Sequence, residues 1–557
     1  MPEATRRGFL SAAASALVPP LRDGPAARRR PNVLVILTDD QGYGDLSLHG
    51  NPHLKTPNLD RIGREGVQFT QFHVCPVCSP TRSSFMTGRY NYRTGVVDTY
   101  LGRSMMYPDE VTVAEMLADA GYRTGIFGKW HLGDNYPLRA MDQGFQESLV
   151  LRGGGLAQPA DAPGSTGYFD PILWRNGTEM KMRGYCTDVF TQAAVQFIET
   201  NRKDPFFAYV ATNAPHDPLQ VEDRWVKPFR DAGLPEHAAK VYGMLTNLDL
   251  NVGLLLGSLQ RLGLERDTLV VFFTDNGPIG DNRYNAGMRG RKGTVYEGGI
   301  HVPCFMRWPG VINGDTKVDR LAAHIDLAPT ILEACGVAKP AGVMFDGVSV
   351  WPLARRQKVE WADRTLFFQW HRGDEPQLWR DCAARNQRWK LVNGTELYDL
   401  AADPAESRDV SAGNAETVAS LRAAYEAWFR DVSATRGYAP PRIVVGSEHE
   451  NPTMLTRQDW RGPKAGWGPN DLGHWEIDIA REGNYEITLL FPAQTPAGEA
   501  EVVLNGQAVS EVVPIQDGDT TAKIGPLRLA AGKAALEPRL HYGAQTLGAN
   551  YCVLRRL

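Results

Sequence analysis

The chain has 557 residues, of which 43% are hydrophobic and 22% charged, and this length suits one to three folded domains. Its net charge of −4 shows no basic excess, so the composition does not indicate nucleic acid as a partner. No apolar run reaches the roughly 18–20 residues that a membrane-spanning helix needs, and seven scattered cysteines exclude a disulfide-rich scaffold.

The first 30 residues resemble an export signal. Arg6 and Arg7 precede a short Ala-rich apolar run, in the order found in twin-arginine signals. The alternative is an arginine-containing tail without a targeting role. We expect residues 1–30 to be a twin-arginine signal and linker, and the protein to be periplasmic or secreted.

From residue 31 onward, short apolar runs alternate with helical patterns. The run NVLVILT at residues 32–38 is continuous and rich in β-branched residues, as in a central parallel strand that is covered on both faces. The same pattern, a strand followed by a polar loop, recurs at residues 123–133, 205–218 and 267–277. Helices with capping signals are indicated at residues 57–66, 112–121 and 326–336. We therefore predict an α/β domain at residues 31–361, with a doubly wound, mostly parallel sheet.

The pattern changes twice beyond this domain. Residues 362–440 combine short runs typical of antiparallel strands with one long helical pattern, which predicts a small α+β subdomain. Residues 445–557 contain only short alternating runs, which predict an appended β-sandwich. Turns between its strands are expected at Gly483-Asn484 and at Asn505-Gly506. The sandwich either binds carbohydrate or serves only for packing and assembly.

Oxygen-bearing side chains directly follow two of the predicted strands. Asp39 and Asp40 follow the first strand, and Asp275 and Asn276 follow the last of the repeated strands. Loops beyond the carboxyl ends of parallel strands gather at one edge of the sheet, so these side chains are expected to meet. Three carboxylates and one amide suit a hard cation, Ca²⁺ or Mg²⁺. Each motif alone could also be a loop cap or a turn.

Basic residues and imidazoles are expected at the same edge. They are Arg82, Lys129, His131, His216 and Lys292. Together, near a metal, they would bind a tetrahedral oxyanion and stabilise developing charge. A single loop histidine is more often structural and a single lysine is usually a solvated charge, so the inference depends on the whole set.

The segment CPVCSPTRSSF, at residues 75–85, contains two overlapping patterns. The first, C-x-x-C, joins Cys75 to Cys78 and is typical of zinc sites, redox pairs or disulfides. Zinc would need a second ligand pair, which is missing here, and nothing else supports a redox pair. The second, C-x-P-x-R, joins Cys78 to Arg82 at the start of a helical pattern, where the helix dipole favours an anionic intermediate. We therefore expect Cys78 to be the nucleophile and Cys75 a buried neighbour.

Residues 31–430 resemble the formylglycine-dependent sulfatases of the alkaline phosphatase superfamily. CSPTRSSFMTGR is similar to their active-site signature. Eight further segments match family patterns in family order: DDQGYGDL, TPNLDRIGREGVQF, GYRTGIFGKWHLG, APHDP, FTDNGP, KGTVYEGGIHVP, DLAPTIL and ELYDLAADPAE. Nine ordered matches are not expected by chance. The resemblance implies an alkaline-phosphatase-like fold and hydrolysis of O-sulfate esters, on a sulfated carbohydrate or an aryl sulfate. The alternatives are a phosphate or phosphonate monoester hydrolase, and an inactive sugar-binding protein.

The resemblance also implies a role for each candidate residue. A formylglycine-generating maturation enzyme would oxidise Cys78 to Cα-formylglycine, whose hydrate attacks sulfur to give a covalent sulfo-enzyme intermediate. The Ca²⁺ ligands would be Asp39, Asp40, Asp275 and Asn276. Arg82 and Lys129 would hold the formylglycine hydroxyls, and Lys292 would bind a sulfate oxygen. His131 would accept a proton as the aldehyde re-forms. His216 would protonate the leaving oxygen or orient the sulfate. Substrate specificity is expected to lie in the loops at residues 151–187 and 366–381.

Overall fold

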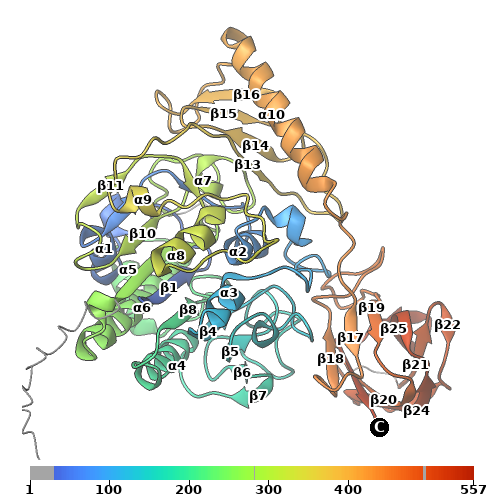
Figure 1. Ribbon diagram of the computed structural model, residues 1–557. Helices are drawn as coiled ribbons and strands as arrows, with labels where there is room; N and C mark the ends of the chain where they lie inside the picture. Colours follow the sequence, from blue (N-terminus) through green and yellow to red (C-terminus); the bar gives the residue numbers. More distant parts are fainter. Residues whose placement is uncertain (1–29, 281–282, 494–496) are drawn as a thin grey trace, which may run out of the picture.

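The computed structural model describes residues 30–280, 283–493 and 497–557 (Figure 1). The predicted export signal at residues 1–30 therefore lies, apart from Arg30, outside the described residues. Among the described residues, every helix is too short or too polar to cross a membrane.

A ten-stranded sheet forms the centre of the α/β domain. Its strands are, in spatial order, β11 (Thr316–Val318), β2 (Val67–Phe69), β10 (Cys304–Arg307), β9 (Thr268–Thr274), β1 (Asn32–Thr38), β8 (Phe206–Ala211), β4 (Arg123–Lys129), β5 (Glu147–Leu151), β6 (Ile172–Arg175) and β7 (Thr178–Lys181). The five strands from β9 to β5 are parallel to one another, whereas β10, β6 and β7 pair with their neighbours in antiparallel fashion. The predicted doubly wound, mostly parallel sheet is thus confirmed.

Helices cover both faces of this sheet (Figure 1). One face packs against α2 (Cys78–Thr87), α3 (Val113–Asp119) and α8 (Leu327–Cys335), and the other against α1 (Pro57–Arg64), α4 (Cys186–Thr200) and α6 (Glu236–Arg261). Alternate side chains of β1 enter the two apolar clusters, because neighbouring residues of a strand point to opposite faces. A strand buried on both sides must be apolar throughout, which explains the continuous run NVLVILT.

The predicted α+β subdomain is present beside the main sheet. Its antiparallel sheet contains β13 (Leu366–Gln369), β14 (Cys382–Arg385), β15 (Trp389–Val392) and β16 (Glu396–Asp399), and it is covered by α10 (Ala415–Ser433). Sequence reasoning missed β14, since CAAR carries no strong strand propensity. Shorter elements elsewhere are β3 (Phe72–His73), β12 (Ala322–Ala323), α5 (Asp223–Asp231), α7 (Glu297–Ile300) and α9 (Trp351–Ala354).

The C-terminal region forms two sheets that pack around one apolar cluster, as expected for a sandwich. The first sheet contains β17 (Ile443–Val445), β19 (Trp475–Ile479), β25 (Gly532–Tyr542), β21 (Gly498–Leu504) and β22 (Gln507–Ala508), with β23 (Val513–Ile515) beside β21 and β26 (Gln545–Leu547) beside β25. The second contains β18 (Thr453–Thr456), β27 (Tyr551–Arg556), β20 (Gly483–Leu490) and β24 (Thr521–Leu529).

One of the two turns predicted for the sandwich is confirmed. Asn505 and Gly506, both with positive φ, join β21 to β22 as a two-residue hairpin. The turn predicted at Gly483-Asn484 is wrong, because both residues lie inside β20. The chain turns at residues 480–482 and passes from one sheet to the other, since β19 pairs with β25 and β20 pairs with β24. Alternation on both sides of a turn does not reveal which strands pair.

Candidate active site

The four candidate metal ligands lie together at the carboxyl ends of β1 and β9, and all are fully buried: Asp39, Asp40, Asp275 and Asn276. The two strands are parallel neighbours with Thr38 opposite Thr274, so the residues that follow them are adjacent. The N–H of Asp40 donates to Asp275 Oδ1 (3.3 Å), and Asn276 Nδ2 donates to Asp40 Oδ1 (2.8 Å). The φ of Asp40 is 64°, a left-handed conformation that aspartate tolerates better than most residues.

Three cations, of which Arg82 and Lys129 are buried and Lys292 is half-buried, neutralise the three carboxylates of this cluster. The pairs are Lys129 with Asp39 (Nζ–Oδ2, 2.6 Å), Lys292 with Asp40 (Nζ–Oδ1, 2.6 Å) and Arg82 with Asp275 (Nη2–Oδ2, 2.7 Å). Burial alone would raise the pKa of Asp40, but the charges of Lys292 and His216 lower it by more than burial raises it. The pKa of Asp40 is therefore well below the usual range. Burial and the Asp39 charge raise the pKa of Asp275 to about 6, against the opposing effect of Arg82.

Three oxygens of the candidate ligands are buried without a hydrogen-bond partner in the described part of the chain. They are Asp39 Oδ1, Asp40 Oδ2 and Asn276 Oδ1. In addition, Asp39, Asp40 and His216 offer ligand atoms that lie within 4.8 Å of one another. A buried oxygen without a partner is unfavourable by about 1–3 kcal/mol. A divalent cation would satisfy all three oxygens at once, so the residues present fit a hard cation with oxygen ligands.

Two histidines lie beside this cluster. His216 follows β8, and its Nε2 is 3.8 Å from Asp40 Oδ2. His131 follows β4 and has a φ of 62°, and its Nε2 is 2.8 Å from the main-chain oxygen of Thr99. Burial lowers the pKa of His216 to about 4, although the Asp40 carboxylate opposes this shift. Burial and the Lys129 charge hold the pKa of His131 well below its usual value. Both rings are therefore neutral near pH 7 and able to accept a proton.

Cys78 is the first residue of α2 and lines a cavity of about 650 Å³. Its side chain lies at the helix N-terminus, where negative charge is stabilised. Burial nevertheless raises the pKa of its thiol, even with Lys129 and Lys292 nearby. An unmodified Cys78 would thus be poorly ionised and a weak nucleophile at neutral pH.

Cys75 has different surroundings from Cys78. Its Sγ lies 3.3 Å from His324 Nε2 and 3.6 Å from Asn91 Oδ1, and both cysteines are free. The disulfide interpretation of C-x-x-C is therefore wrong. Within the described ranges, the groups that could hold a metal contain no cysteine, so zinc is not supported either.

The cavity beside Cys78 is lined by the predicted specificity loops and by further segments. The loop at 151–187 contributes Gly154 and Gln158, and the loop at 366–381 contributes Trp370 and Arg372. Sequence reasoning missed Thr99, Tyr100, Arg291 and Trp467, which also line it. Thr99, Tyr100 and Trp467 stand in no recognised motif, and long-range packing brings them to the site, whereas Arg291 directly precedes the recognised segment KGTVYEGGIHVP.

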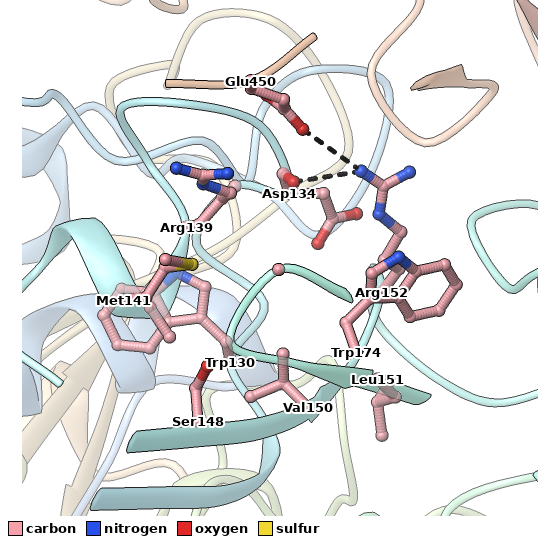
Figure 2. A pocket seen from close by; sticks show the side chains of 13 residues that line it. Trp130, Asp134, Arg139, Met141, Ser148, Val150, Leu151, Arg152, Trp174 and Glu450 are labelled. Carbon is pink, nitrogen blue, oxygen red and sulfur yellow. Dashed lines mark hydrogen bonds and ion pairs between the residues drawn. The ribbon is translucent and has the colours of Figure 1, made fainter. Parts of the chain in front are cut away.

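A second cavity lies between the α/β domain and the sandwich (Figure 2). It is lined by Trp130, Arg152 and Glu450, among others, and holds only about 40 Å³. Ligand sites typically span ~300–1,000 Å³, so this cavity is too small for a sugar. In the described part of the chain, the cavity beside Cys78 combines a size suitable for a sugar with the candidate reactive groups Cys78, His131, His216 and Lys292.

Comparison with known proteins agrees with this geometry. The family model "Sulfatase" matches residues 31–337, which is more than half of the chain, and the model "N-sulphoglucosamine sulphohydrolase, C-terminal" matches residues 290–428. The chain belongs to the sulfatase family. It is therefore a sulfuric ester hydrolase. Both matched ranges end before the sandwich begins at β17.

Several relatives illustrate this membership. Arylsulfatase A of Bos taurus is 34% identical over 426 residues, covering 69% of this chain and 80% of the relative. N-acetylgalactosamine-6-sulfatase of Mus musculus is 30% identical over 418 residues, covering 69% of this chain and 77% of the relative. Ps i-CgsB, in its crystal structure in complex with k-i-k-neocarrahexaose, is 29% identical with a TM-score of 0.67. The match covers 74% of this chain and 95% of that protein. The phosphonate monoester hydrolase of Agrobacterium radiobacter shares the fold, with a TM-score of 0.52 and 22% identity. The match covers 71% of this chain and 96% of that protein.

Proposed function

We propose that this sulfatase hydrolyses O-sulfate esters of a sulfated saccharide through a formylglycine derived from Cys78. The observation that carries the proposal is the position of Cys78. It lies at the start of α2, in a cavity that His131, His216 and Lys292 also line. Cavity and reactive groups together provide a nucleophile, proton acceptors and a cation for a bound sulfate.

The charges of the site support a divalent cation and a sulfate ester. The three buried carboxylates and their three cationic partners balance one another, and both histidines are neutral. A bound Ca²⁺ would leave the site with two positive charges. A sulfate ester and an ionised formylglycine hydroxyl carry one negative charge each and would restore neutrality. We propose Ca²⁺ held by Asp39, Asp40, Asp275 and Asn276, which would lower the charge on the sulfate and favour the ionised nucleophile.

The side chains around Cys78 account for each remaining step. Arg82 and Lys129 would hold the two hydroxyls of the formylglycine hydrate, one of which attacks sulfur and displaces the sugar oxygen. The second hydroxyl then loses its proton to His131 as the aldehyde re-forms and sulfate leaves. His216, with a pKa of about 4, is neutral in the empty site and could orient the sulfate. The negative charge of a bound substrate would raise this pKa, so that the ring takes up a proton from water and passes it to the leaving oxygen.

The cavity lining favours an anionic saccharide. It includes the cations Arg291, Lys292 and Arg372, and the described residues that line it include no carboxylate. It also presents the aromatic rings of Tyr100 and Trp370, which suit the apolar faces of sugar rings. The names of the N-acetylgalactosamine-6-sulfatase and of the neocarrahexaose complex point in the same direction. An aryl sulfate is the alternative substrate.

Maturation and export belong to the same proposal. Formylglycine at Cys78 requires a formylglycine-generating enzyme as a partner. The Arg6-Arg7 pattern supports twin-arginine export to the periplasm or the medium. Because twin-arginine cargo crosses the membrane folded, the modification would precede export.

Sulfate release from defined substrates tests the proposed function. The full chain would be assayed on sulfated saccharides, on an aryl sulfate and on the matching aryl phosphate, with Cys78→Ala as control. We expect sulfate release that depends on Cys78, and at most slow phosphate release. A dominant phosphatase activity would contradict the assignment to sulfate esters, and activity retained by Cys78→Ala would contradict the nucleophile.

A further inference from the structure

The sandwich shares an apolar core with the α/β domain. Leu101, Met105 and Leu138 of the α/β domain are buried in the same cluster as the sandwich interior. Figure 1 shows the sandwich on the side of the α/β domain where β5, β6 and β7 lie, connected through the chain that leaves α10. Because apolar side chains from both sides fill one core, the sandwich is held in a fixed position against the α/β domain.

Polar contacts also fix the position of the sandwich (Figure 2). Glu450 accepts hydrogen bonds from the N–H of Tyr136 (2.8 Å) and from Asn135 Nδ2 (3.2 Å), and lies 3.8 Å from Arg152 Nη2. Arg152 in turn lies over the Trp174 ring, 5.0 Å from its centroid, and donates to the main-chain oxygen of Asp134 (3.2 Å).

The segment between β18 and β19, residues 457–474, reaches the active-site cavity. Gln458 Nε2 donates to the main-chain oxygen of Thr99 (2.8 Å), the same atom that His131 Nε2 contacts, and lies 3.4 Å from that His131 nitrogen. Trp467 lines the cavity itself, and it is the residue that the sandwich contributes to the described lining. A part of the chain outside both matched family models thus borders the site.

The residues on both sides of Trp467 are held in place. Trp460 Nε1 donates to the main-chain oxygen of Gly466 (3.0 Å). The N–H of Gly468 donates to Asp471 Oδ2 (2.7 Å), and Arg457 Nη1 donates to the Gly468 oxygen (2.6 Å). A side chain on such a braced loop is preorganised for binding, because little loop ordering is left for the ligand to impose.

Trp467 presents its ring to the cavity. The residue is 37% exposed, so part of a large aromatic side chain is open to solvent on a loop that is held in place. Its ring contacts that of Tyr100 edge-on, with the two centroids 5.0 Å apart. The Arg372 guanidinium lies 4.4 Å from the Tyr100 centroid and 5.0 Å from the Trp370 centroid. Three aromatic rings and a guanidinium therefore line one side of the cavity.

We propose that Trp467 is a substrate-binding residue that contacts the saccharide part of the sulfated substrate, so that the sandwich completes the active-site cleft. This inference rests on the proposed function. The sulfate would lie near Lys292 and His216, next to Asp40. The ring contact of Trp467 is with Tyr100, and in the described part of the chain no interaction joins Trp467 to Lys292, His216 or Asp40, so we place it on the sugar side of the cavity. Its contact is the same before and during the reaction, and it would therefore strengthen binding more than the chemical step.

Steady-state kinetics of Trp467→Ala test this inference. The substrate would be the chondroitin sulfate, carrageenan or heparan sulfate oligosaccharide that the wild-type chain desulfates fastest. Loss of this aromatic contact should raise KM about tenfold, which corresponds to about 1.4 kcal/mol, with kcat changed far less. Trp467→Phe should restore part of the affinity. The control is Trp225→Ala, a half-buried tryptophan of α5 away from the cavity, which should leave KM unchanged.

The possible outcomes separate this inference from the proposed function. If the wild-type chain releases no sulfate from any sulfated saccharide, the proposed function fails and the inference with it. If the wild-type chain is active and Trp467→Ala binds its substrate equally well, the inference alone is overturned. Melting temperatures of the variants show whether each has folded. If Trp467→Ala melts well below the wild type, the KM values of Trp467→Phe and Trp467→Leu decide whether Trp467 binds substrate. Unchanged KM in both folded variants overturns the inference.

Discussion

Replacing Arg82 with methionine should strongly destabilise the α/β domain, because Asp275 would lose its main partner. The Arg82 guanidinium is 1% exposed and donates to Asp275 Oδ2 from Nη2 (2.7 Å) and Nε (3.1 Å), and from Nη1 to the Lys129 main-chain oxygen (2.9 Å). Removing one partner of a buried ion pair lowers the free energy of unfolding by about 3–5 kcal/mol. For a large domain this corresponds to a melting temperature lower by roughly 5–10 °C.

The matched control is Arg388→Met. Arg388 pairs with Asp399 at the same distance, 2.7 Å, but its side chain is 60% exposed. An exposed pair contributes only about 0–1 kcal/mol, so this variant should melt close to the wild type. Both variants would be compared by calorimetry with a chelator present, so that a bound cation does not stabilise Asp275. Equal melting temperatures for Arg82→Met and Arg388→Met would refute the inference that Arg82 neutralises a buried charge.

The loss caused by Arg82→Met should also depend on pH. The pKa of Asp275 is about 6 in the wild-type fold, raised by burial and by Asp39 against the opposing effect of Arg82. Without Arg82 this pKa rises further, so the folded variant keeps a proton that the folded wild type loses near pH 6 and that the unfolded chain has already lost at about pH 4. Stability then falls with rising pH, and the gap to the wild type should widen between pH 6 and pH 8 by up to about 1.4 kcal/mol per pH unit. A gap that narrows with rising pH would contradict this sign.

Three further predictions concern the site itself. Cys78→Ala should abolish sulfate release while the protein keeps its melting temperature, whereas Cys75→Ala should keep nearly normal activity. A large loss of activity in Cys75→Ala would instead indicate a joint role for the two cysteines. Chelation should reduce both activity and melting temperature, and added Ca²⁺ should restore both, since a ligand that binds only the folded state stabilises it; indifference to removal of the metal, verified by elemental analysis, would contradict the oxygen cage. Lys292→Ala should raise KM for sulfate esters, because the lysine is expected to bind a sulfate oxygen; an unchanged KM would assign it a structural role beside Asp40.

Much of the site could be predicted because it depends on strand order alone. Asp39 and Asp275 follow two apolar runs, and parallel neighbours align such runs so that their carboxyl ends coincide, as β1 and β9 do. Lys129, the last residue of β4, and His216, which follows β8, come to the same edge because β4 and β8 are parallel neighbours in this sheet. Sequence periodicity was sufficient here because buried parallel strands carry an uninterrupted apolar signal.

The wall of the cavity could not be predicted in this way. Tyr100 lies in a loop without regular structure, and Trp467 lies more than three hundred residues beyond it in a different domain. Their contact depends on how the sandwich packs on Leu101 and Met105, which no local pattern encodes. The pairing of β20 was missed for the same reason, since alternation fixes the buried face of a strand and not its neighbour.

The chemical state of Cys78 tests the central claim most directly. The peptide that contains it would be isolated from active protein matured in its native host and weighed by mass spectrometry. The account predicts the mass expected when –CH₂SH is replaced by –CHO, with the change located at Cys78 and not at Cys75. Fully active protein that carries only unmodified cysteine at position 78 would contradict the formylglycine mechanism.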